Sequence, residues 1–203
     1  MLQKPMTASL SPQLLDTAFQ DHEDSSYLIQ RLANADRAAF AQLVLCYQDP
    51  LINYLTKLAN CRAKAEDIAQ ESFVKLYRAV QKSPDRQWHI RAYLYRIAIN
   101  MFCSQERRQK HFGKLKHLLR PHLKETHGDQ LLRNEAQDQV QKAISRLPVR
   151  YRVPLVMREI EGWRLIDIAN CLNINEGTVK SRIFRGKQKL KDLLEDYWRG
   201  ARK

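Results

Sequence analysis

Apolar residues recur every three to four positions along most of the chain, which is the spacing of one face of an α-helix. In the first half of the chain they form three groups, within residues 28–32, 40–47 and 51–58. Asp49-Pro50 separates the last two groups, and because a proline disfavours a helical backbone in the preceding residue, we expect one helix to end there. With only 6 glycines and little strand-like alternation, the pattern predicts an all-α fold.

The periodicity weakens in two places. Residues 1–24 are polar and end in the acidic run DHED, which is typical of a flexible leader. Helical periodicity holds over 25–110, fades over 111–129, where glycine, proline and cations mix, and returns over 130–203. We therefore expect two small helical domains, each with a modest core, joined by a flexible linker.

The second periodic block contains a helix-turn-helix pattern. A short helix is expected around 165–172, a turn at 173–175, and a longer helix after it. Asn173 suits the turn because asparagine tolerates a left-handed backbone, and Asn175 is placed to cap the next helix. The packing positions are apolar: Ile168, Leu172, Ile174, Val179 and Ile183, with a small Ala169 between them. In such a motif the second helix enters the major groove of DNA.

That second helix is strongly basic. The segment EGTVKSRIFRGKQKLK carries six cations and one carboxylate, and the apolar positions Val179, Ile183, Gly186 and Leu190 leave the cations largely on other faces. The whole chain has 35 Lys and Arg against 22 Asp and Glu, a net charge of +13. A solvated basic face is the alternative, but the motif and the net charge together favour contact with DNA.

Other classes of site find little support. No stretch approaches the ~20 apolar residues that cross a bilayer, and the N-terminus has no secretion signal, so we expect a cytoplasmic protein without membrane insertion. The chain has no Cys-x-x-Cys pair, and we expect its cysteines to be small buried side chains. The cysteines are Cys46, Cys61, Cys103 and Cys171, and four linker histidines are His111, His117, His122 and His127. We expect no metal, no cofactor and no enzymatic activity.

The segment AEDIAQESFVKLYRAVQK, residues 65–82, has an apolar side and a polar side. Asp67, Gln70 and Glu71 fall on the polar side, and Phe73 lies at the margin of the apolar one. An acidic spot on a basic protein would repel DNA, so it suits a protein partner. The alternative is an ordinary solvated helix with ion pairs between residues four apart.

Aromatic and cationic residues alternate in RQWHIRAYLYRIAINMFCSQERRQK, residues 86–110. The rings are Trp88, Tyr93, Tyr95 and Phe102, and the cations include Arg91, Arg96, Arg107 and Arg108. A core stripe is already available from Ile90, Leu94, Ile97 and Met101, so we expect several rings on other faces. Rings between cations form a stacking surface for single-stranded nucleic acid.

The order AEDIAQESFVKLYRA, RAYLYRIAIN, linker, then LPVRYRVPLVMREIEGWRLIDIANCLNINEGTVKSRIFRGKQKL resembles a bacterial RNA polymerase sigma factor of the extracytoplasmic-function group, sigma-70 family. The resemblance covers residues from about 25 to 195. It implies a promoter-melting domain that docks on the polymerase clamp and opens the minus-ten element, and a C-terminal helix-turn-helix domain that binds the minus-thirty-five element. The implied partners are core RNA polymerase, single- and double-stranded promoter DNA, and an anti-sigma factor.

The family's functional positions transfer residue by residue. Those implied for core polymerase are Asp67, Gln70, Glu71 and Phe73. The surface expected for the minus-ten element consists of Asn100, Trp88, Tyr93, Arg91 and Arg96, with Asn100 in the pocket for a flipped base. The residues expected at the minus-thirty-five element are Lys180, Ser181, Arg182, Phe184 and Arg185. One departure is Pro154, which we expect to kink its helix.

Two other interpretations remain, one of them a protein that does not touch DNA. A conventional helix-turn-helix repressor or activator would need no polymerase, and it leaves the first block unexplained. A sigma-like decoy that titrates an anti-sigma protein would carry a receiver domain, for which this chain has no room.

Overall fold

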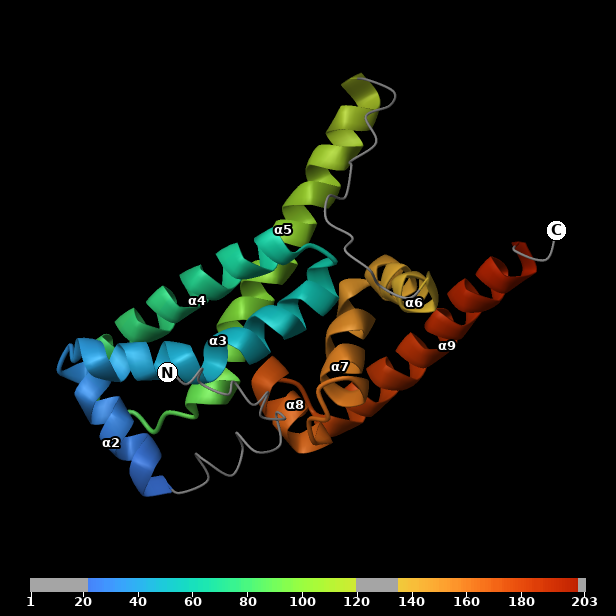
Figure 1. The fold of residues 1–203 in the computed structure, drawn as a ribbon. Coiled ribbons are helices and arrows are strands. Elements are labelled where there is room, and N and C mark those ends of the chain that lie inside the picture. Colours follow the sequence, from blue (N-terminus) through green and yellow to red (C-terminus); the bar gives the residue numbers. More distant parts are fainter. Residues whose placement is uncertain (1–21, 120–134, 201–203) are drawn as a thin grey trace, which may run out of the picture.

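The computed structural model describes residues 22–119 and 135–200, and the regular structure of this part of the chain is entirely helical. The first unit contains α2 (His22–Ala33), α3 (Arg37–Ala59), α4 (Arg62–Lys82) and α5 (Ile90–Leu119). The second unit contains α6 (Glu135–Arg146), α7 (Val149–Glu159), α8 (Leu165–Leu172) and α9 (Glu176–Gly200). Figure 1 shows the two groups of helices, which confirm the all-α prediction.

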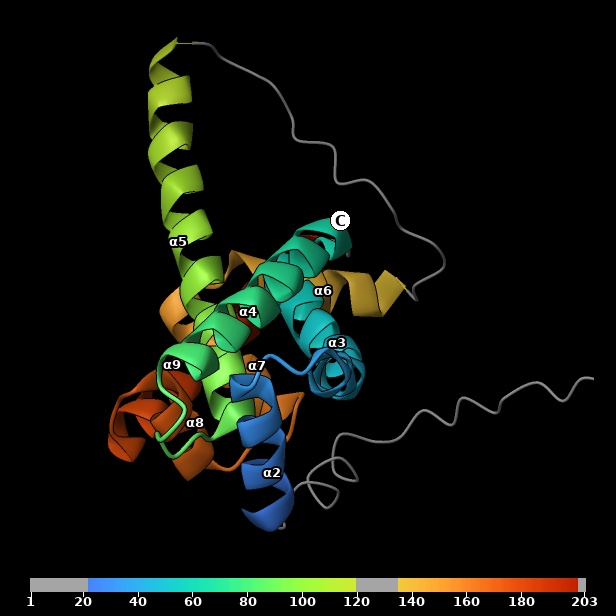
Figure 2. The same cartoon turned by 90° about the vertical axis from the view of Figure 1, so that its left-hand side faces the viewer.

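Two helices extend past the expected domain limits. α2 begins at His22, inside the expected leader, and α5 continues to Leu119, nine residues beyond the expected end of the first domain at residue 110. The last turns of α5 project away from the other helices in both Figure 1 and Figure 2. Residues 120–129 of the expected linker lie outside the described part of the chain.

The core of the first unit lies between α3, α4 and α5. Leu43, Leu55, Leu76, Leu94 and Phe102 contribute to it and are fully buried. Helix α2 adds Leu32, also fully buried, against this core.

The expected break at Asp49-Pro50 is wrong, because Pro50 lies inside the continuous helix α3. Proline removes one backbone donor and costs a helix interior about 3 kcal/mol. The turns on either side bury Leu43, Leu51 and Leu55 completely, and each buried leucine contributes about 1.5–3 kcal/mol. Packing against α4 and α5 therefore keeps the helix intact across the proline.

The two helical units lie directly against each other. Arg152 on α7 is 5% exposed and donates from Nη1 to the Leu58 carbonyl oxygen at the end of α3, at 2.8 Å. The Trp163 ring, in the loop between α7 and α8, packs on the Tyr95 ring of α5 with centroids 4.9 Å apart. Segments some 70 to 100 residues apart in the sequence thus share one interface.

Candidate nucleic-acid and protein interfaces

The helix-turn-helix forms as the sequence predicts. Helix α8 ends at Leu172, and Asn173 follows in the left-handed region with φ of 53°. Asn175 Oδ1 accepts a hydrogen bond from the Thr178 backbone N–H at 2.7 Å, which caps the start of α9. Val179 and Ile183 are buried, so α9 turns its apolar stripe to the core and its basic side outward.

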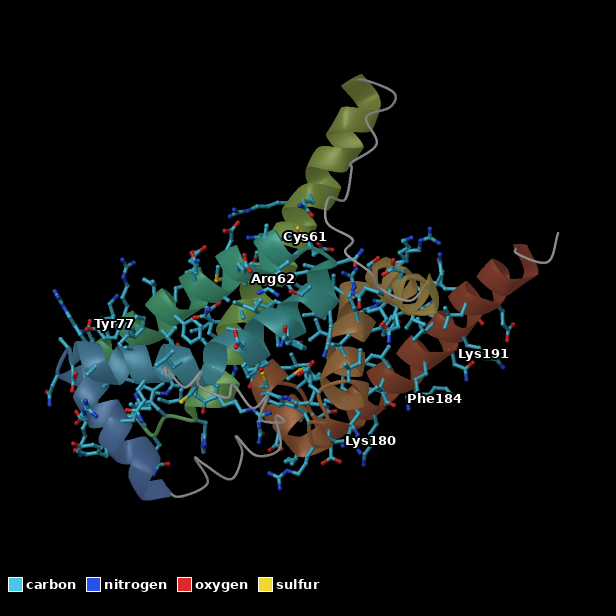
Figure 3. The ribbon with its side chains drawn as sticks, viewed as in Figure 1. Cys61, Arg62, Tyr77, Lys180, Phe184 and Lys191 are labelled. Atoms are coloured by element: carbon cyan, nitrogen blue, oxygen red, sulfur yellow. The ribbon has the colours of Figure 1, made fainter. Side chains whose placement is uncertain are left out.

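The residues expected at the minus-thirty-five element lie along the outer side of α9. Lys180, Ser181, Phe184 and Arg185 are exposed, whereas Arg182 is half-buried. Figure 3 shows Lys180 and Phe184 on the outward side of the helix. The Phe184 side chain is 64% exposed among cations, which suits an apolar contact with a thymine methyl group.

Three of the described α9 lysines have carboxylate partners, and one of them is Lys191, whose Nζ lies 3.6 Å from Glu195 Oε1 on the same helix. Lys180 Nζ lies 3.0 Å from Glu176 Oε1 on the same helix, and Lys187 Nζ lies 2.9 Å from Glu159 Oε2 on α7. These pairs are exposed, so each contributes at most about 1 kcal/mol and is readily exchanged for a phosphate. The basic face therefore remains available to DNA.

Aromatic rings gather where the loop after α4 enters α5. Trp88 is 7% exposed, donates from Nε1 to the Ser83 carbonyl oxygen at 3.0 Å, and meets the Tyr93 ring edge-on at 4.8 Å between centroids. The Arg86 guanidinium lies 5.0 Å from the Trp88 ring and 5.4 Å from the Tyr93 ring. Arg86 was not identified as a site residue from the sequence. Its position two residues before Trp88 could have indicated a cation close to that ring.

The expectation of several spare rings on α5 is wrong in part. Tyr95 is 2% exposed and Phe102 is fully buried, so both are core residues. Ile97 and Met101, which were assigned to the core stripe, are only half-buried. The inward face of α5 is rotated relative to that stripe because packing comes from α4 on one side and from the second unit on the other. The stacking surface is reduced to Tyr93 and the edge of Trp88.

Asn100 is exposed at the mouth of a cavity of about 330 Å³ between α5 and the end of α8. The lining residues are Arg96, Ile99 and Asn100 from α5, and Cys171, Leu172 and Asn173 from the second unit. Arg96 Nε donates to the Cys171 carbonyl oxygen at 2.9 Å, and Arg96 Nη2 donates to the Asn170 carbonyl oxygen. The structure thus brings Arg96 and Asn100 together, beside the helix-turn-helix.

Arg91 lies in the first turn of α5. Its guanidinium stacks 4.2 Å from the centroid of the Trp163 ring, and Trp163 is 5% exposed. Trp163 was not selected from the sequence, where nothing local distinguishes it from a core tryptophan.

The polar side of α4 is exposed as expected. Asp67, Gln70 and Glu71 face solvent, and Glu71 Oε1 lies 2.8 Å from Lys75 Nζ. Phe73 differs, because it is 4% exposed and belongs to the core. Its ring is therefore unavailable to a partner in this conformation, and the candidate surface consists of the three polar residues.

The cysteines divide by environment. Cys171 is buried, as expected, and burial raises the pKa of its thiol to about 12. Cys61 is exposed at the start of α4, contrary to expectation, because it is the N-cap residue and precedes the first helical turn. Figure 3 shows it at this helix end. Within residues 22–119 and 135–200 no group of three His, Cys, Asp or Glu side chains could hold a metal ion. The linker histidines lie outside the residues whose side chains are described.

No helix in the described part of the chain is both long enough and apolar enough to cross a membrane.

Comparisons with known proteins give a consistent picture. The family model for Sigma-70 region 2 matches residues 43–112, and the model for Sigma-70, region 4 matches residues 137–190. The chain is 32% identical over 193 residues to the RNA polymerase sigma-H factor of Pseudomonas aeruginosa, covering 88% of this chain and 98% of that protein. It is 31% identical over 183 residues to the ECF RNA polymerase sigma factor SigW of Bacillus subtilis, covering 83% and 95%.

Two solved structures of similar fold are complexes of two proteins. The sigma factor RpoE, crystallised with the anti-sigma factor NepR from Bartonella quintana, superposes with a TM-score of 0.59 at 26% identity over 77% of this chain and 96% of that one. CnrH, in complex with the cytosolic domain of CnrY, gives a TM-score of 0.61 at 23% identity over 84% and 97%, and it supports the fold alone.

Proposed function

This chain belongs to the sigma-70 family of RNA polymerase sigma factors, in the extracytoplasmic-function group, and from that membership we propose that it binds core RNA polymerase and directs transcription initiation at specific promoters. The observation that carries the proposal is the presence of both matched regions in one chain, each with an exposed surface suited to its part. A conventional helix-turn-helix regulator has no use for the first unit. The chain is a transcription factor and not an enzyme.

The basic side of α9 is proposed to read the minus-thirty-five element as double-stranded DNA. Lys180, Ser181 and Arg185 are exposed along one side of the helix and can reach base edges or phosphates in a major groove. Arg182 is half-buried and is proposed to contact the backbone at the margin. Phe184 adds an exposed ring for a thymine methyl group.

The start of α5 is proposed to bind the non-template strand of the minus-ten element. Trp88, Tyr93 and Arg86 form a compact group of rings and cation on which a base can stack. Asn100 is exposed and offers both a donor and an acceptor to the edge of a flipped base. Arg91 and Arg96 are proposed to meet the phosphates of the same strand.

Asp67, Gln70 and Glu71 are proposed to bind core polymerase. They form an exposed polar face on a helix whose other face is fully packed, so they are free to meet a partner without loss of the fold. The complex of RpoE with the anti-sigma factor NepR supports an anti-sigma partner for this chain as well. We place its action in the cytoplasm, where polymerase and promoter DNA are found.

The proposal is tested by transcription of a genomic fragment library of the source organism with core polymerase, in the presence and absence of the protein. New start sites that depend on the protein are the expected result. A protein that binds DNA but confers no start sites on core polymerase would be a conventional regulator instead.

A further inference from the structure

We propose that Tyr151 is a positioning residue for promoter recognition, and that its hydroxyl group holds the Arg185 guanidinium in the orientation that reads a base edge in the major groove. The inference rests on the proposed function, and in particular on the assignment of Arg185 to the minus-thirty-five element. It goes beyond that assignment because Tyr151 lies on α7, behind the basic helix, and is not itself a proposed DNA contact.

The place of the Tyr151 ring is fixed by close packing between two helices. Tyr151 lies in the first turn of α7, is 6% exposed, and faces α9, which runs beside α7 in Figure 1. A Cβ atom added to Gly186 would lie 3.4 Å from the Tyr151 carbonyl oxygen and 3.5 Å from Tyr151 Cβ. Gly186 follows Arg185 directly in the sequence. The backbone that carries Arg185 is therefore held against the backbone that carries Tyr151.

A hydrogen bond joins the two side chains. The Arg185 guanidinium donates to the Tyr151 hydroxyl oxygen. A phenylalanine would fill the same space between α7 and α9, so packing alone does not account for the hydroxyl group. Arginine has five N–H donors, and a bidentate contact with guanine uses two of them. Arg185 can therefore keep one N–H on Tyr151 while it presents its planar fork to a base.

Three cations surround the phenol group. The Arg150 guanidinium lies 4.8 Å from the centroid of the Tyr151 ring, and Arg185 and Lys189 approach from α9. Desolvation raises the pKa of the Tyr151 hydroxyl, but the hydrogen bond from Arg185 and the charges of the three cations lower this pKa below its ordinary value. The surroundings thus favour negative charge on the oxygen, which suits its place as the acceptor of an Arg185 N–H.

The hydrogen bond has a consequence for specificity. Arg185 is exposed, and an unrestrained arginine at such a position samples many rotamers, of which only some direct its fork at a base edge. An arginine that is already oriented loses less conformational freedom when it binds the correct base. With a different base in the groove, Arg185 makes no bidentate contact whether or not it is held. Tyr151 therefore increases discrimination between bases more than general affinity for DNA.

The test measures binding of holoenzyme to a promoter mapped by the library transcription, and to duplexes in which each minus-thirty-five base pair is replaced in turn. Tyr151→Phe removes the hydroxyl group and keeps the ring against Gly186. Tyr54→Phe is the matched control, since Tyr54 is fully buried in the first unit and its hydroxyl has no hydrogen-bond partner within the described residues. Circular dichroism and urea unfolding show whether each variant is folded.

Arg185→Ala first identifies the base pair that Arg185 reads, as the one whose replacement no longer weakens binding. At that base pair we expect Tyr151→Phe to reduce discrimination about threefold to tenfold, which is the range expected for ordering one long side chain. Discrimination at the other base pairs should not change, and Tyr54→Phe should change none. Tyr151→Phe should have no further effect when Arg185 is already alanine, because the hydroxyl group acts only through Arg185.

A second measurement follows the contact in the free full chain, without polymerase or DNA. The ultraviolet absorbance of tyrosinate is recorded as the pH is raised. Because the pKa of Tyr151 is lowered, the absorbance that develops at the lowest pH should be missing from Tyr151→Phe. Arg185→Gln removes a cation and a donor from the phenol, so it should move this absorbance to higher pH. Lys191→Gln removes the same charge from α9 away from the phenol and should leave the curve unchanged.

Each result has a distinct meaning. A tyrosinate titration that Arg185→Gln does not shift more than Lys191→Gln would overturn the contact between Arg185 and Tyr151. A shifted titration with unchanged discrimination in Tyr151→Phe would make Tyr151 a packing residue and overturn its positioning role. A loss of binding for Arg185→Ala that is equal on all duplexes would also overturn that role, while the chain still confers start sites. Absence of start sites with the unaltered chain would instead refute the proposed function.

Discussion

Gly186 on α9 lies so close to α7 that a Cβ atom added to it would sit 3.4 Å from the Tyr151 carbonyl oxygen. The small residue at this position lets α9 pack closely against α7, the helix behind it. It fixes how far the basic side of α9 stands out from the second unit.

The close packing at Gly186 limits the size of the side chain that this position can hold. Gly186→Ala should change the free energy of unfolding by less than about 1 kcal/mol, because the gain in helix propensity offsets the tight contact. Gly186→Val should destabilise by about 1–3 kcal/mol, since its extra methyl groups meet Tyr151 and Leu155. Urea unfolding of the full chain measures both. Equal stability for the two variants would mean that α9 shifts freely against α7.

Within α9 we expect a residue that reads bases and a residue that only contacts phosphates to respond differently to a change of DNA sequence. Arg185→Ala should cost about 1–3 kcal/mol of binding on the correct minus-thirty-five sequence and much less on a scrambled one, as expected for a bidentate contact to guanine. Lys189→Ala should act alike on both sequences and lower the salt slope by about one. The binding free energy and the salt slope are both measured from the binding of holoenzyme to promoters with the correct and with the scrambled sequence, at several salt concentrations. An equal loss on both sequences for Arg185→Ala would make that residue a phosphate contact.

The exposed face of α4 predicts a loss of polymerase affinity without loss of fold. Asp67→Ala/Glu71→Ala should weaken binding to core polymerase at least about tenfold while changing stability by no more than about 0.5 kcal/mol per site. Asp192→Ala/Glu195→Ala removes the same charge from the exposed side of α9 and serves as the control. If both double variants bind core polymerase equally well, the assignment of this face is wrong.

Asn100 should matter for strand opening more than for closed-complex binding. A base held outside the stack needs hydrogen bonds that repay a few kcal/mol of unstacking. Asn100→Ala should therefore lower permanganate reactivity of the minus-ten thymines while leaving binding to duplex promoter nearly unchanged. Gln188→Ala, an exposed amide on α9, is the control. Unchanged permanganate reactivity would return Asn100 to an ordinary polar position.

The buried thiol of Cys171 predicts a loss of stability in alkali. Burial raises its pKa to about 12, above the value of about 9 in an unfolded chain, so its contribution is complete below pH 9 and is lost as the pH rises toward 12. The slope from one such group approaches about 1.4 kcal/mol per pH unit. Urea unfolding at pH 8, 9 and 10 should show a smaller slope for Cys171→Ala. Identical slopes would mean that the thiol does not titrate with unfolding.

Local chemistry explains what could be predicted from the sequence. The turn at Asn173, the cap at Asn175 and the two faces of α4 depend on residues a few positions apart, and the pattern of side chains within one helix determines them. The rest depended on packing between distant segments. Pro50 stays helical because of its neighbours' burial, and Phe73 turns inward for the same reason.

No local pattern in the sequence indicated the contacts between the two units. Arg96 and the end of α8 are 75 residues apart, and Trp163 lies 68 residues beyond Tyr95. Nothing in the periodicity of either segment indicates the other. The orientation of α5, and with it the number of rings left for DNA, follows from this contact and so could not be predicted from α5 alone.

The covalent connection between the units changes how strong their interface needs to be. Only the 15 residues 120–134 separate α5 from α6. A domain tethered at this length meets its neighbour at an effective concentration in the millimolar range. An interface with an intrinsic dissociation constant of about 0.1 mM, too weak to hold two separate molecules together in a cell, would then keep the two units in contact in about nine chains in ten. Single substitutions of modest energy at this interface are therefore enough to change the fraction of chains in which the two units are in contact.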